Sequence, residues 1–158
     1  RRTDYDKHGG AAPAAHFVHL DQPRDSARAM VTPIAEAQGV KFKHATIFNI
    51  WKSMTPPPQS VPLAICDWRT VSERDYVLGM TVEGEIEVPH ITIARSADKP
   101  KWYFVPDLGT DESFVFVGAD LDPSHPLGCA HSAFVHPDPK LQGIPRASIE
   151  VRVLACSE

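Results

Sequence analysis

The sequence predicts a mainly β protein, a β-sandwich or barrel with one or two short helices. About eight short segments are rich in β-branched and aromatic residues or alternate between apolar and polar residues. Prolines make up 15 of the 158 residues, roughly twice the usual ~5%. Because each internal proline removes a helical donor, this composition excludes a bundle of long helices.

Residues 26–38 form the predicted helix, with Ser26 as the expected N-cap and Gly39 as the C-terminal stop. Pro33 falls inside this stretch, so we expect a short or broken helix. In front of it, residues 1–15 predict a loop. Residues 16–21 predict a short strand that closes at Pro23.

The rest of the chain predicts strands separated by turns that contain proline and glycine. The expected strands are residues 43–51, 61–68, 81–88, 91–94, 102–105, 113–118, 130–135 and 147–154. The last one alternates cleanly, so its odd-numbered and even-numbered side chains should point to opposite faces.

Composition narrows the class of protein further. The length fits one domain, residues 1–158, and the net charge of −4 argues against a basic nucleic-acid-binding surface. No stretch approaches the ~20 apolar residues that span a bilayer. The three cysteines are far apart and form no C-x-x-C motif, which favours a reducing compartment, and we expect the cytoplasm.

His19 and Asp21 form the first candidate metal-binding motif. Residues at i and i+2 share one face of a strand, so an imidazole and a carboxylate can converge on one ion. A second histidine would complete a set of two histidines and one carboxylate, which suits Fe(II) and O2 chemistry. His136-Pro137-Asp138 repeats the motif, but no histidine follows it. After Asp21 five histidines remain, at positions 44, 90, 125, 131 and 136.

Arg146 and Ser148 form the second candidate motif, at the start of the last predicted strand. Because they share a face, they can hold a carboxylate by charge and by one more hydrogen bond. Arg146 follows His131 by 15 residues, and a hairpin of that size would bring the two side by side. His136 competes with His131 as a ligand, and Arg152, of the same parity, competes with Arg146.

The order H-x-D, H, R-x-S resembles that of the Fe(II)/2-oxoglutarate-dependent oxygenases. Further runs narrow the resemblance: Phe48-Asn49-Ile50-Trp51-Lys52, Pro62-Leu63-Ala64-Ile65-Cys66-Asp67, Trp102-Tyr103, His131-Ser132-Ala133-Phe134 and Arg146-Ala147-Ser148-Ile149-Glu150-Val151-Arg152. Together they resemble the hydroxylase/desaturase family of fungal and bacterial secondary metabolism. That family includes relatives of the cephamycin methoxylation subunit, gibberellin-desaturase-like proteins and fungal aziridine-forming oxygenases. The resemblance covers roughly residues 16–154, and part of the family's usual N-terminal region is expected to be missing.

The resemblance implies a double-stranded β-helix, the jelly-roll of the cupins, with His19, Asp21 and His131 as the iron ligands. It also implies that Arg146, helped by Ser148, pairs with the distal carboxylate of 2-oxoglutarate. The cosubstrate's other end would chelate Fe(II), and O2 would take the remaining position. The expected reaction is C–H oxidation of a small metabolite or amino acid by hydroxylation, desaturation or ring closure, with succinate as coproduct.

The same resemblance suggests substrate-pocket roles for Asn49, Trp51, Lys52 and Arg152. His16 is expected to be a bystander, because it falls on the strand face opposite His19. Two other functions stay open. One is an Fe(II) oxidase or cyclase in which R-x-S binds a substrate carboxylate, and the other is a jelly-roll binding module without catalysis. The oligomeric state cannot be derived from the sequence.

Overall fold

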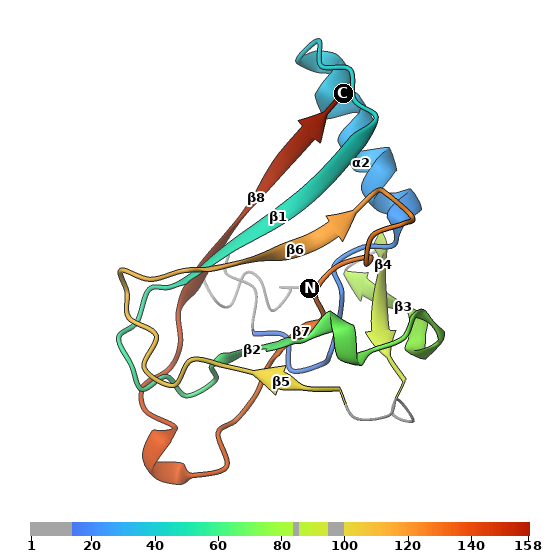
Figure 1. Ribbon diagram of the computed structural model, residues 1–158. Helices are drawn as coiled ribbons and strands as arrows, with labels where there is room; N and C mark the ends of the chain where they lie inside the picture. Colours follow the sequence, from blue (N-terminus) through green and yellow to red (C-terminus); the bar gives the residue numbers. More distant parts are fainter. Residues whose placement is uncertain (1–13, 84–85, 95–99) are drawn as a thin grey trace.

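The computed structural model describes residues 14–83, 86–94 and 100–158, so the loop predicted for residues 1–15 lies almost wholly outside the described residues (Figure 1). One antiparallel sheet has the order β6-β1-β8, a second has the order β5-β2-β7, and β3 and β4 pair with each other. The strands are β1 (His44–Ser53), β2 (Leu63–Cys66), β3 (Tyr76–Glu83), β4 (Ile86–Ile93), β5 (Trp102–Tyr103), β6 (Phe114–Asp120), β7 (His131–Ala133) and β8 (Ser148–Ser157). The predicted mainly β class is confirmed.

A two-residue segment, His19 and Leu20, connects the second sheet to the β3-β4 pair. His19 exchanges backbone hydrogen bonds with His131 of β7, at 3.1 and 2.9 Å. Leu20 exchanges them with Ile91 of β4, at 2.7 and 3.2 Å. The strand predicted for residues 16–21 is therefore reduced to these two bridges, which place His19 directly beside His131.

Alternate residues of β1 are buried and form its inner face. The side chains on this face differ from one end of the strand to the other. At its start, Ala45 and Ile47 pack in a cluster with the helix α2. At its end, Trp51 packs with Leu63 of the opposite sheet. Asn49 lies between these two apolar clusters and is fully buried.

The helix α2 (Arg24–Ala37) covers the first of these clusters with Ala27, Val31 and Ala35, spaced four residues apart. It begins after Pro23 and has no side-chain cap, so the expectation that Ser26 is the N-cap is wrong. It also runs unbroken through Pro33. Proline is tolerated because it lies on the exposed side of the helix, where water can solvate the carbonyl that loses its donor.

The expected pairing of the strands carrying His131 and Arg146 is wrong. β7 pairs with β2 and β8 pairs with β1, so the two strands belong to different sheets. The strand predicted for residues 81–88 is also wrong, because it joins the end of β3 to the start of β4. Strand pairing depends on packing across the whole chain, whereas the sequence pattern reports only local periodicity.

In the described part of the chain, three short 3₁₀ helices lie in the connections: η1 (Trp68–Thr70), η2 (Glu73–Asp75) and η3 (Pro139–Leu141). Each is capped by a side chain that accepts a hydrogen bond from a backbone amide, those of Asp67, Ser72 and Asp138. The aspartate of the second H-x-D motif therefore caps a turn. Within the described residues, no helix has the length and apolar character needed to cross a bilayer.

Candidate metal centre

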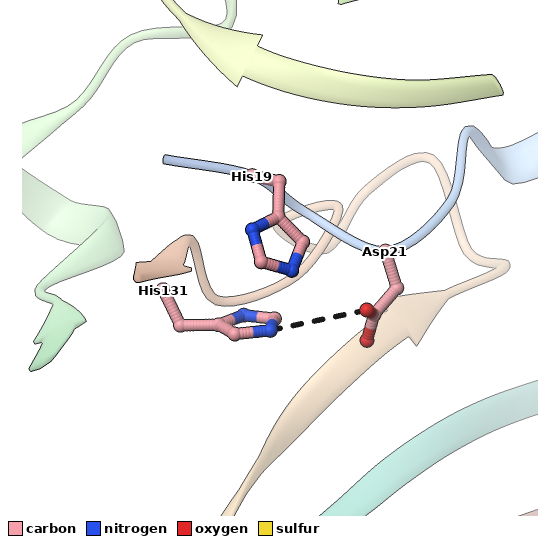
Figure 2. Close-up of side chains that lie close together, drawn as sticks. All are labelled: His19, Asp21 and His131. Atoms are coloured by element: carbon pink, nitrogen blue, oxygen red, sulfur yellow. Dashed lines mark ion pairs between the residues drawn. The ribbon is translucent and has the colours of Figure 1, made fainter. Parts of the chain in front are cut away.

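Three side chains from two distant parts of the chain converge between the sheets: His19, Asp21 and His131 (Figure 2). One potential ligand atom of each lies within 4.8 Å of the others. The two imidazole rings are in contact with their planes inclined at 55° and their centroids 4.3 Å apart. His131 Nε2 points at Asp21 Oδ1 from 3.8 Å. The structure thus brings together the three residues that the sequence predicted as ligands.

The backbone fixes the tautomer of both histidines. Nδ1 of His19 lies 3.0 Å from the carbonyl of Phe17, and Nδ1 of His131 lies 3.0 Å from the carbonyl of Cys129. Because a carbonyl only accepts hydrogen bonds, Nδ1 must carry the proton in each ring. The lone pair is then on Nε2, which is the form that ligates a metal.

His131 is also held in its neutral form by its surroundings. Its side chain is almost fully buried, with the ring of Phe116 against it at 4.8 Å. Burial lowers the pKa of His131, and the nearby His19 and Arg152 lower it further, against the opposing effect of Asp21. A neutral imidazole with a free Nε2 is the state a divalent metal requires.

Asp21 is held through both of its carboxylate oxygens. Asn49 donates from Nδ2 to Oδ2 at 2.5 Å. Arg152 lies 3.2 Å from Oδ1 and 3.5 Å from Glu150. Burial and the charge of Asp21 raise the pKa of Glu150, while Arg152 opposes this effect. Two carboxylates and one guanidinium therefore form a connected network beside the histidines.

A cavity of about 840 Å³ opens from this centre between the two sheets. Its volume is in the range of sites that hold small molecules. The two sheets and the segment before α2 all contribute side chains to it. Besides His19, Asp21 and His131, the lining includes His16, Gln22, Trp51, Leu63, Val88, His90, Ala133, Arg146, Ser148, Glu150 and Arg152.

Arg146 lies half-buried in this cavity and is held by two contacts. It donates to the carbonyl of Val61 at 2.7 Å, and its guanidinium lies over the ring of Trp51, 5.1 Å from the centroid. Burial lowers its pKa, but an arginine stays charged in proteins. No carboxylate among the described residues lies within ion-pair distance of it, in contrast to Arg152. Arg146 therefore presents a fixed positive charge to the cavity.

The last strand has the alternation that the sequence predicted. Its even-numbered residues Ser148, Glu150 and Arg152 line the cavity. Its odd-numbered neighbours are exposed on the outer face of the sheet, at 53% for Ile149 and 52% for Val151. Glu150 was missed as a cavity residue, although its parity was the signal that could have identified it.

Two residues predicted for the substrate pocket lie elsewhere. Lys52 alternates with the inward-facing Trp51, so it points to the outer face of the sheet and does not line the cavity. Asn49 lies behind Asp21. His16, expected to be a bystander, lines the cavity. The irregular backbone before His19 places it there, and strand periodicity gives no sign of that.

The donor set fits a divalent transition metal. Two neutral imidazoles and one carboxylate leave coordination positions open, and this combination selects non-haem Fe(II) among the common metals. Both histidine tautomers agree with this role, because each Nδ1 is already bonded to the backbone. His19, Asp21 and His131 are therefore the residues that would hold Fe(II).

Two curated proteins are similar to most of this chain. Aspirochlorine biosynthesis protein N of Aspergillus oryzae is 27% identical over 148 residues, covering 92% of this chain and 62% of its own length. The Fe(II)/2-oxoglutarate-dependent dioxygenase nvfI of Aspergillus novofumigatus is 27% identical, covering 89% of this chain and 51% of its own length. The resemblance to Fe(II)/2-oxoglutarate oxygenases of fungal secondary metabolism is confirmed.

Solved structures also resemble this chain. The iron and alpha-ketoglutarate-dependent endoperoxidase NvfI superposes with a TM-score of 0.76 at 26% identity, covering 94% of this chain and 56% of that chain. The jelly-roll expectation is confirmed by this match. The chain spans between half and two thirds of the length of these relatives. A family model described as "Oxidoreductase/YMDC permease-like domain" matches residues 1–156, and the chain belongs to this family.

Proposed function

We propose that this chain carries the iron and cosubstrate site of an Fe(II)/2-oxoglutarate-dependent dioxygenase. The observation that supports this most strongly is Arg146. It is a half-buried cation without an ion-pair partner among the described residues, and it lines the same cavity as His19, Asp21 and His131. An anionic ligand that reaches Arg146 at one end and the metal centre at the other satisfies both features. A short dicarboxylate such as 2-oxoglutarate has these two ends.

Each of the chain's own residues has a defined task in this proposal. His19, Asp21 and His131 hold Fe(II), which, once bound with 2-oxoglutarate and O2, supplies the oxidation of a C–H bond. Arg146 binds the distal carboxylate of 2-oxoglutarate, and Ser148, on the same side of the strand, donates one more hydrogen bond.

Trp51 supports this anchor indirectly. Its indole ring holds the guanidinium of Arg146 in place from one side, while the carbonyl of Val61 holds it from another. The arginine is thereby ordered before the ligand arrives, so that less side-chain entropy is lost on binding.

The substrate is proposed to be a small molecule of secondary metabolism, oxidised by hydroxylation, desaturation or ring closure. The relatives support this class, because one is named for aspirochlorine biosynthesis and another as an endoperoxidase. We further propose a reducing compartment, the cytoplasm, since Cys66, Cys129 and Cys156 are free thiols.

The test is anaerobic visible spectroscopy with Fe(II) and 2-oxoglutarate. A metal-to-ligand charge-transfer band should appear only when both are present. Arg146→Gln should weaken 2-oxoglutarate binding by roughly 10- to 100-fold, the value of a lost charge-assisted pair. Lys52→Gln is the matched control, because it removes one positive charge from β1 on the outer face of the sheet, away from the cavity.

Three results would count against the proposal. A folded wild-type protein without the band contradicts the cosubstrate assignment. If the band survives in Arg146→Gln but is lost in Arg152→Gln, the carboxylate of 2-oxoglutarate is bound by Arg152 and not by Arg146. Turnover of a substrate under O2 without succinate supports the Fe(II) oxidase instead.

A further inference from the structure

Asn49 is a polar residue buried in the core, where an apolar side chain would be expected. Its side chain is fully buried on the inner face of β1, between the apolar Ile47 and Trp51. Its Nδ2 donates to Asp21 Oδ2, but its Oδ1 has no hydrogen-bond partner. A buried polar atom without a partner costs free energy. A leucine would fill a similar space without that cost, whereas the amide provides the contact with Asp21.

The contact fixes the orientation of the amide. A carboxylate only accepts hydrogen bonds, so Asn49 must turn its NH2 group toward Asp21. The carbonyl Oδ1 then faces the opposite way, against Gly118 of β6.

Gly118 gives independent support for this arrangement. The register of β6 against β1 shifts at this point: Ile47 pairs with Ala119 and Phe48 with Val117, so Gly118 is the extra residue of a β-bulge. A Cβ on Gly118 would lie 2.4 Å from Asn49 Oδ1. Glycine inside a strand weakens it and often marks a close approach by another group. Here the group that approaches is the amide of Asn49.

We propose that Asn49 is a positioning residue of the metal centre, which holds Oδ2 of Asp21 and presents Oδ1 to His131. The two carboxylate oxygens are thereby distinguished: Oδ2 is bound by the amide, and Oδ1 lies 3.2 Å from Arg152 and 3.8 Å from His131 Nε2. This inference rests on the proposed metal site. Its consequence is that Asp21 offers the metal one oxygen in a fixed direction.

The test compares Asn49→Leu with Ser53→Ala in titrations of the metal-free protein with Co(II), and with Fe(II) under anaerobic conditions. Ser53 is the matched control, because it is also fully buried on the inner face of β1 and donates a hydrogen bond, to Thr55 at 2.9 Å. Asn49→Leu should weaken metal binding by about 10- to 100-fold, the usual effect of losing a partner of a metal ligand. Ser53→Ala should leave the affinity unchanged.

A readout of stability separates positioning from packing. In the metal-free protein, Asn49→Leu removes the unpartnered Oδ1 but also the donor to Asp21 Oδ2, and because these two effects oppose each other the urea midpoint should change little. A lower midpoint with unchanged metal affinity would make Asn49 a structural residue and overturn the inference. The d–d absorption of bound Co(II) should also change in Asn49→Leu, because the carboxylate of Asp21 is then held by Arg152 alone.

Gly118→Ala gives a second route to the same answer if Asn49→Leu does not fold. The added methyl group pushes the amide away from Gly118 without altering any group at the cavity, so metal affinity should fall. Gly109→Ala is its control, since the Cβ there meets the side chain of Asp111 in an exposed loop. If wild-type protein binds no metal, the proposed function fails. If it binds and the Asn49 and Gly118 variants bind equally well, only this inference fails.

Discussion

At the scale of single residues, Arg152 in β8 and Arg146 just before β8 differ in whether their charge is neutralised by a carboxylate. Arg152 is already paired with Asp21 and Glu150, so its charge belongs to the network around the metal centre. Arg146 contacts a carbonyl and an aromatic ring, neither of which cancels its charge. The sequence gives both residues the same parity, and only their partners show which one is available to an anion.

Burial also defines the chemistry of Cys129. Desolvation, with a smaller contribution from Cys66, raises the pKa of the Cys129 thiol from 9.0 to about 12. In the unfolded chain the thiol ionises near its ordinary pKa, so above pH 9 the unfolded state releases a proton that the folded state retains. The free energy of unfolding should therefore fall as pH rises from about 9 to about 12.

Urea unfolding at a series of pH values from 8 to about 11 checks this expectation. Tyr76, whose pKa is also raised by burial, contributes to the same trend, so the comparison must be with Cys129→Ala. That variant should lose part of the pH dependence. Identical slopes in the two proteins would show that Cys129 does not contribute.

At the scale of elements, α2 shows how a helix can contain a proline without breaking. The buried stripe of Ala27, Val31 and Ala35 holds the helix on β1 and β6. Pro33 lies outside this stripe, and both it and Ala29, whose carbonyl loses its donor, are exposed. Packing along one side thus outweighs a local helix breaker on the other.

This arrangement predicts that Pro33→Ala stabilises the protein. An alanine restores the backbone hydrogen bond and removes a cost of ~3 kcal/mol, while the more flexible unfolded chain returns up to ~1 kcal/mol. We expect a net gain of about 2 kcal/mol in the free energy of unfolding, measured by urea denaturation. Glu36→Ala, exposed in the same helix, is the control and should change it little. A loss of stability in Pro33→Ala would contradict this reasoning.

At the scale of the whole molecule, the metal centre joins segments that are far apart in the chain. His19 and Asp21 come from the segment beside β4, His131 from the second sheet, Arg152 from the first sheet and Arg146 from the connection that leads into it. The ligands of this site come together only in the folded chain, so a metal ion binds the folded state and not the unfolded one. Binding and folding are therefore coupled.

Metal binding should accordingly raise the free energy of unfolding. At a free Fe(II) or Co(II) concentration of 100 times Kd, the gain should be about 2.7 kcal/mol, and a chelator should reverse it. Thermal denaturation with and without metal measures the shift. Asp21→Asn should lose most of it, and an equal shift in that variant would show that the metal binds elsewhere.

Local patterns in the sequence predicted the face on which the side chains of β8 lie and the residues of the candidate metal centre. Alternation fixed which side chains of β8 share a face, and the motif order predicted His19, Asp21 and His131, which the fold brings within ligand distance. The first succeeds because residues two apart on a strand share a face whatever strand lies beside them. The second rests on the resemblance in motif order, since His19 and Asp21 lie outside the regular strands.

Tertiary structure alone decided the relations between distant segments. It placed β7 and β8 in facing sheets instead of a hairpin, turned Lys52 outward, and set Asn49 behind Asp21. These outcomes depend on which strands pair and which faces are buried across the whole chain. Such pairing is decided by the total packing and hydrogen bonding of the fold, and periodicity over a few residues carries no information about it.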